Sequence, residues 1–168
     1  NYVDGVSNWG NSVVMAINPC VKTFKCGAIL RDKFYTSPPW SYQLCDSYSI
    51  FALMSYPIKG FHILLDILPD IIKVYPKTKI YVAAGDFTYR KYGLIKSIIM
   101  DLTPDYYWYL QKKIEKNHLQ DYIIFLGYLN EEEMVNHLLK ANVFVSASST
   151  EHISTTLGEA MILGVPSI

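Results

Sequence analysis

The sequence predicts an α/β protein with a Rossmann-like parallel sheet and helices on both faces. Two observations carry this prediction. Four short apolar runs of buried-strand type recur between residues 50 and 146, and helical patterns alternate with them. Neither a glycine-rich dinucleotide fingerprint nor a phosphate-loop motif accompanies them, so ordinary dinucleotide-binding and nucleotide triphosphatase functions lose their main support.

The first half of this alternation begins with a strand at residues 50–54. A helix is expected over 59–75, and Pro69 in its interior should bend or split it. A second strand follows at 79–84. The stretch 87–106 is rich in tyrosine, and its pattern fits no single element.

The second half continues with a helix from Asp105 to about Lys116 and a strand at 123–126. Asn130 is a good N-cap, and the three glutamates after it oppose the helix dipole, so a helix should run to about Ala141. A fourth strand at 143–146 and a helix over 157–163, ended by a glycine, complete the pattern.

Composition and charge narrow the function classes. The 168 residues are 51% hydrophobic, and 15 basic residues balance 15 acidic ones, which suits one folded core and argues against nucleic acid as a partner. No apolar run approaches the roughly 20 residues of a membrane-spanning helix. Four scattered histidines and three cysteines match no metal-ligand spacing, so we expect no metal site.

The two ends of the chain suggest how it is divided. Residues 1–47 look irregular and are expected to be a connecting segment or the tail of a preceding domain, with the α/β domain over 48–168. The chain opens on Asn1 and closes on the apolar stretch 164–168, which enters what looks like another strand. We therefore expect an internal piece of a longer protein, with the α/β domain truncated at its C-terminus.

The stretch after the fourth strand carries the chemistry. Glu151 and Glu159 are separated by seven residues, and the second one falls in the next helix. Between them, the backbone N–H groups of Ser154, Thr155 and Thr156 lie near the helix start. Such a helix end attracts phosphate, because its amides are unpaired and the macrodipole is positive there.

At these residues the sequence resembles the retaining glycosyltransferases of family 4, which have the GT-B fold. The family's signature is two glutamates seven residues apart, then Ala-Met and Gly-x-Pro. It stands here as Glu151-x7-Glu159, Ala160-Met161 and Gly164-Val165-Pro166. Two further motifs match in the expected order, Tyr56-Pro-Ile-Lys59-Gly60 and Phe125-Leu-Gly127.

The resemblance implies a donor-binding domain that takes a nucleotide-diphosphate sugar as substrate, with no other cofactor and no metal. It gives Glu151 a catalytic place near the donor sugar and Glu159 hydrogen bonds to the ribose. Lys59 and the amides of residues 154–156 would bind the diphosphate, whose negative charge grows as the bond to the sugar breaks.

For the whole protein, the resemblance implies a hexosyltransferase, with a polysaccharide or lipid-linked acceptor among the candidates. The acceptor would enter from an N-terminal domain absent here, so this piece alone should be inactive. A cytoplasmic location is expected, with contact to the inner membrane face through the missing half. Which sugar, base and acceptor are used stays open.

Departures from the family pattern keep other functions open. The family usually has an arginine where this chain has Met54, so Arg90, Lys91 or the missing half would have to supply that charge. With His152 in place of a glycine-rich segment, Met54 favours a non-catalytic scaffold domain as the alternative. A nucleotide-sugar epimerase is a weaker one, and either glutamate could simply cap a helix, as in Thr156-Leu-Gly-Glu159.

Overall fold

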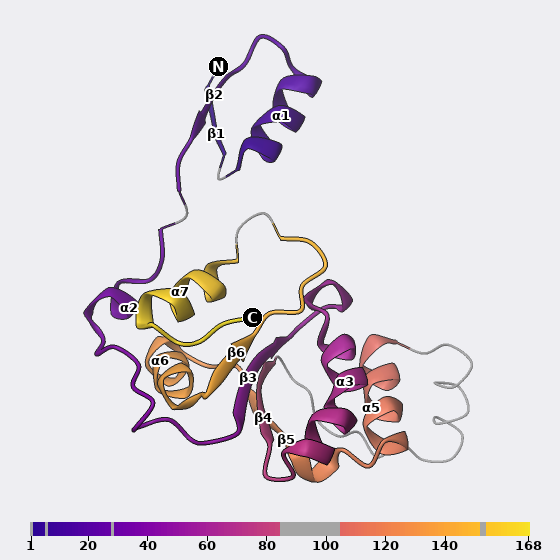
Figure 1. The fold of residues 1–168 in the computed structure, drawn as a ribbon. Coiled ribbons are helices and arrows are strands. Elements are labelled where there is room, and N and C mark those ends of the chain that lie inside the picture. Colours follow the sequence, from indigo (N-terminus) through magenta and orange to yellow (C-terminus); the bar gives the residue numbers. More distant parts are fainter. Residues whose placement is uncertain (1, 6, 28, 85–104, 152–153) are drawn as a thin grey trace.

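The computed structural model of the chain confirms the α/β prediction (Figure 1). It describes residues 2–5, 7–27, 29–84, 105–151 and 154–168. Residues 87–104 of the tyrosine-rich stretch, with Arg90 and Lys91, lie outside the described residues, as do His152 and Ile153.

All four predicted strands pair in one parallel sheet in the order β5-β4-β3-β6. Their bounds are β3 Ser49–Met54, β4 Lys79–Ala84, β5 Ile123–Gly127 and β6 Val143–Val145. Beyond β6, the end of the chain pairs alongside it, because the Phe144 amide donates to Pro166 O at 2.8 Å and the Ser146 amide to Ile168 O at 2.8 Å. These residues form an isolated parallel bridge, Phe144 with Ser167, and the truncation of the domain stays a prediction.

Helices cover both faces of this sheet (Figure 1). On one face lie α3 (Phe61–Val74) and α5 (Tyr106–Lys116), whose apolar residues form one buried cluster with β3, β4 and β5. On the other face lie α2 (Asp32–Thr36), α6 (Glu131–Lys140) and α7 (Thr155–Leu163), which form a second cluster around Phe51 and Phe144. A short 3-10 helix η2 (Gln120–Tyr122) leads into β5.

Two helix boundaries differ from the sequence prediction. Pro69 does not split α3, which runs unbroken after the 3-10 turn η1 (Pro57–Lys59). Leu65 and Leu68 are fully buried before Pro69, and Ile71 and Ile72 after it pack partly buried against the same core, so both halves of the helix are anchored to the sheet. The last helix begins earlier than expected, because the Ser154 hydroxyl caps it by accepting from Leu157 N. Glu159 is thus the fifth residue of α7 and not its cap.

The N-terminal region is more regular than its composition suggested. The strands β1 (Tyr2–Gly5) and β2 (Lys22–Lys25) are parallel and joined by α1 (Asn8–Ile17), which together make a small β-α-β unit. The side chain of Asn11 ties this unit together by donating to Phe24 O at 3.0 Å. The prediction that this stretch is irregular is therefore wrong. The sequence of α1 has no charged residues that would mark an exposed helix face, so its pattern did not indicate a helix. The division at residue 47 stays a prediction.

Candidate functional site

The candidate site lies where β3 and β6 end, because these strands are neighbours and their carboxyl ends meet at the same edge of the sheet. The turn η1 follows β3, and the loop 146–151 follows β6. The two segments are hydrogen-bonded to each other, since Ser149 N donates to Ile58 O at 2.9 Å. This contact brings together two motifs that lie about ninety residues apart in the sequence.

The conformation and the surroundings of Gly60 explain why a glycine follows the lysine of this motif. Its φ of 71° lies in the left-handed region, and a Cβ there would come 1.9 Å from Ala147 O. A side chain at this position would therefore collide with the backbone of the loop that carries Glu151. The glycine permits the close approach of the two segments.

Lys59 and Glu151 form an ion pair across this contact. Glu151 also accepts a hydrogen bond of 2.9 Å from the Ser148 hydroxyl. Partial burial opposes the ionised carboxylate, but the hydrogen bonds from Lys59 and Ser148 and the charge of Lys59 outweigh it and lower the pKa of Glu151. Both side chains remain about a quarter exposed, at 26% and 25%. The site therefore presents a partly solvated carboxylate and ammonium at neutral pH.

The start of α7 faces the same end of the sheet. Ser154 is its N-cap, and Thr155 and Thr156 begin its first turn. The first N–H groups of a helix have no partner within it, so they and the macrodipole favour an anion. The nine residues of α7 carry no acidic side chain in the first turn that would oppose such a ligand.

A cavity of about 290 Å³ lies between the β-α-β unit and this loop. Ser7 and Trp9, at the beginning of α1, line one side, and Thr150 and Glu151 line the other. Trp9 as a whole is 66% exposed. An aromatic ring beside a carboxylate is a surface that suits the apolar face and the hydroxyls of a sugar ring.

Glu159 lies elsewhere, in a buried ion pair with Arg31. The guanidinium Nε and Nη2 donate to the two carboxylate oxygens at 2.7 and 2.8 Å. Glu159 is only 3% exposed. The structure therefore joins Lys59 to Glu151 and places the second motif glutamate apart from that pair. Sequence reasoning missed Arg31, although an acidic residue on an otherwise apolar helix requires a buried partner.

Met54 ends β3 and is fully buried in the core cluster on the α3 face. Its side chain offers no charge to the loop edge. Among the described cations, Lys59 lies at the site, and the two alternatives Arg90 and Lys91 lie outside the described residues.

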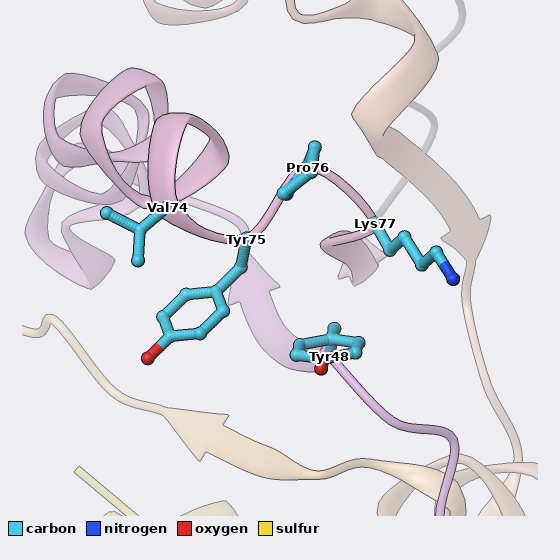
Figure 2. A pocket seen from close by; sticks show the side chains of 5 residues that line it. All are labelled: Tyr48, Val74, Tyr75, Pro76 and Lys77. Atoms are coloured by element: carbon cyan, nitrogen blue, oxygen red, sulfur yellow. The ribbon is translucent and has the colours of Figure 1, made fainter.

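Other cavities lie at the opposite edge of the sheet. One of about 190 Å³ is lined by Tyr48, Val74, Tyr75, Pro76 and Lys77 (Figure 2). These residues precede β3 and β4, so the cavity is at the amino ends of the strands. Tyr48 and Tyr75 stack there with ring centroids 5.7 Å apart. The cavity contains no carboxylate, so it does not match the chemistry of the motifs.

Within the described ranges, no cluster of three or more His, Cys, Asp or Glu side chains has the geometry to bind a metal ion. Over the same residues, every helix is too short or too polar to span a bilayer.

Residues 50–168 match the family model of the glycosyl transferases group 1. This match covers more than half of the chain, so the chain belongs to that family, and the epimerase alternative loses its basis. No curated protein matches the sequence.

Solved structures share the fold at low sequence identity. The pneumococcal O-GlcNAc transferase GtfA, solved with UDP and GlcNAc, aligns with 99% of this chain at a TM-score of 0.66 and 18% identity. TarM from S. aureus, solved with UDP, aligns with 98% of this chain at a TM-score of 0.68 and 16% identity. Sucrose-phosphate synthase from Thermosynechococcus elongatus aligns with 99% of this chain at a TM-score of 0.68 and 19% identity.

The chain spans only part of each of these proteins: 29% of GtfA, 29% of TarM and 39% of the synthase. The likeness establishes a GT-B glycosyltransferase fold for the matched part.

Proposed function

We propose that this chain is the donor-binding part of a retaining glycosyltransferase of the family 4 type, which takes a hexose from a nucleotide-diphosphate sugar. The observation that carries the proposal is the Lys59–Glu151 pair at the carboxyl ends of β3 and β6, three residues before the N-cap of α7. UDP in the solved GtfA and TarM structures supports a nucleotide-sugar ligand.

The chemistry follows from charge separation. As the bond between the anomeric carbon and the diphosphate breaks, positive charge grows on the sugar and negative charge on the leaving group. Lys59 and the amides at Ser154, Thr155 and Thr156 would stabilise the departing phosphates. Glu151, kept ionised by its lowered pKa, would face the positive sugar, with Trp9 on the other side of the cavity.

The finer predictions of the resemblance belong to the same proposal. The phosphates are neutralised by Lys59 and amides, so activity should survive chelation of divalent metals by EDTA. The acceptor, such as a polysaccharide or a lipid-linked sugar, would be bound by a further domain. The 168 residues alone should therefore transfer no sugar from the donor. We expect the enzyme to be cytoplasmic and in peripheral contact with the inner membrane face, where a lipid-linked acceptor would lie.

The test is a calorimetric titration of UDP- and GDP-sugars against the full-length protein and its Lys59→Ala variant. Loss of a charge-assisted contact to phosphate should weaken donor binding by about tenfold or more. Lys73→Ala is the matched control, since Lys73 also forms an ion pair, with Asp70 at 2.6 Å, but at the other end of α3. Equal affinity of the Lys59→Ala variant and the wild type would contradict the proposed site.

The scaffold alternative is favoured by one observation, the buried Met54 at the position where the family usually has a cation. A scaffold would bind none of the nucleotide sugars at millimolar concentration. An enzyme would bind at least one of them and transfer its sugar with the anomeric configuration kept, which NMR of the product reads directly.

A further inference from the structure

The edge of the sheet opposite the candidate site has two hollows that share one pair of aromatic rings. Tyr48 lies just before β3, and Tyr75 directly follows α3 (Figure 2). The cavity of about 190 Å³ described above adjoins both rings, and a second cavity, of about 320 Å³, adjoins the same two rings. The two cavities and the tyrosine pair together are called the amino-edge groove below.

The backbone holds both rings of this groove in place. Tyr75 O accepts hydrogen bonds from the amide and the hydroxyl of Thr78, at 3.0 and 2.8 Å. Tyr48 O accepts from Lys79 N at 3.1 Å. The two rings stack, with their planes 30° apart and their centroids 5.7 Å apart. A ligand would therefore meet an aromatic surface that is already formed, and binding would not have to order it.

The backbone conformation of Tyr48 indicates that its ring has a use. Its φ of 61° lies in the left-handed region, which a bulky side chain rarely adopts. Glycine would satisfy such a turn without strain. Tyr48 is also 46% exposed, so burial in the core does not explain why a tyrosine stands there. Strained residues of this kind gather at ligand sites.

The groups that line the groove combine apolar surface with neutral polar groups. Among the residues that the structure describes, none is hydrogen-bonded to the hydroxyl of either tyrosine. The larger hollow adds the amide side chain of Asn142 and the apolar side chains of Ile71 and Val143. Of the described residues that line the two hollows, Lys77 alone carries a charge.

This chemistry favours a neutral ligand. A nucleotide or another anion would meet a single ammonium group, and it would also meet the C-terminal end of α3, where the helix macrodipole is negative. A sugar ring instead has apolar C–H faces, which pack on tyrosine rings, and hydroxyls, which pair with phenol and amide groups. Two adjoining hollows suit two consecutive rings of one saccharide chain.

We propose that the amino-edge groove binds a neutral oligosaccharide, with one sugar ring in each hollow. The six residues of β3 put its two ends roughly 20 Å apart, so a sugar in this groove lies far from the Lys59–Glu151 pair. The ligand is therefore a remote segment of a long acceptor or product chain and not the donor. Because the family consists of glycosyltransferases, such a chain belongs to its chemistry.

The test titrates maltohexaose, mannohexaose and chitohexaose against the full-length protein by calorimetry. Tyr48→Gly removes one ring and suits the left-handed backbone, so this variant should fold. Tyr75→Leu removes the other ring and keeps apolar volume. Each variant should bind the preferred hexasaccharide about tenfold more weakly, as expected for the loss of one ring contact. Tyr35→Leu is the matched control, because Tyr35 is 58% exposed and lines neither hollow.

UDP binding separates this inference from the proposed function. Tyr48→Gly should bind UDP as the wild type does, and Lys59→Ala should keep its affinity for the hexasaccharide. If the wild type binds the hexasaccharide but neither UDP nor GDP, the proposed function fails and the groove stands.

The inference is overturned if the wild type binds none of the three hexasaccharides at millimolar concentration. It is equally overturned if both tyrosine variants bind them as tightly as the wild type, because the sugar would then lie elsewhere. Sedimentation gives the remaining outcome. A wild type that self-associates, beside a Tyr75→Leu variant that stays monomeric, would identify the groove as an interface between copies of this chain and would also overturn the inference.

Discussion

The two motif glutamates, Glu151 and Glu159, are separated by only seven residues but lie in very different surroundings. Glu151 pairs with Lys59 in a partly solvated loop, and both side chains are about a quarter exposed. Glu159 pairs with Arg31 through two hydrogen bonds, and its side chain is almost completely buried. Each pair joins two distant parts of the chain, but only the first can exchange its partner for a ligand at small cost.

This difference follows from solvation. In a partly solvated ion pair, water and salt screen part of the attraction, and either group that loses its partner can be rehydrated, so a diphosphate can take Lys59 from Glu151. A buried carboxylate that loses its partner keeps the whole cost of desolvation. We therefore expect the Lys59–Glu151 pair to control binding and the Arg31–Glu159 pair to control stability and position.

The largest effect is expected at Gly60, which holds the Lys59 side of the comparison in place. Gly60→Ala puts a Cβ within 1.9 Å of Ala147 O at a φ of 71°, so the turn and the loop must move apart. We expect the free energy of unfolding to fall by about 3 kcal/mol and donor binding to be lost. Urea denaturation and calorimetry measure the two.

Gly127→Ala is the matched control. Gly127 also has a positive φ, of 73°, but a Cβ there would meet nothing within 4 Å. The Gly127→Ala variant should therefore lose only about 1 kcal/mol of its free energy of unfolding, from the strain of the left-handed conformation. Equal losses in both variants would mean that the contact with Ala147 contributes nothing.

The second largest effect concerns the buried pair. Glu159→Ala should lower the free energy of unfolding by about 2 to 3 kcal/mol, somewhat below the usual value for a fully buried pair because Arg31 is a third exposed. A double-mutant cycle with Arg31→Ala, followed by urea denaturation, should show strong coupling. Additive losses would indicate that the two side chains do not stabilise each other.

Much of this fold could be predicted from local patterns. The apolar runs at β3 to β6 and the Asn130 cap, which forms a complete capping box with Glu133, depend on neighbours in the sequence. Pro69 and the start of α7 could not be predicted in the same way. In α3 the tertiary burial of leucines overrides the local preference of proline.

For the site, the sequence motifs predicted residues but not their partners. The parallel order of β3 beside β6 brings Lys59 to Glu151, and a strand alternation does not determine that order. Arg31 reaches Glu159 across 128 residues, from a region whose composition looked irregular. Long-range pairing of this kind depends on the whole fold, so local spacing carries no information about it.

A smaller effect is expected for Lys59→Ala on stability. The pair with Glu151 is a quarter exposed on each side, so its loss should lower the free energy of unfolding by less than about 1 kcal/mol. Thermal unfolding of the variant beside Lys73→Ala measures this. A loss as large as that of Glu159→Ala would remove the distinction between the two pairs.

The smallest effect is the pH dependence of the Glu151 pair. Its folded pKa lies below the ordinary 4.5, so the unfolded chain takes up a proton first as the pH falls. The stability that the pair contributes is therefore fully present well above pH 4.5 and is lost as the pH drops through the lowered value. The difference in Tm between wild type and Glu151→Gln, followed from pH 7 down to the acid limit of folding, should shrink towards zero. A difference that stays constant would mean that Lys59 does not stabilise the ionised carboxylate, and Glu151 would then owe its position to Ser148 alone.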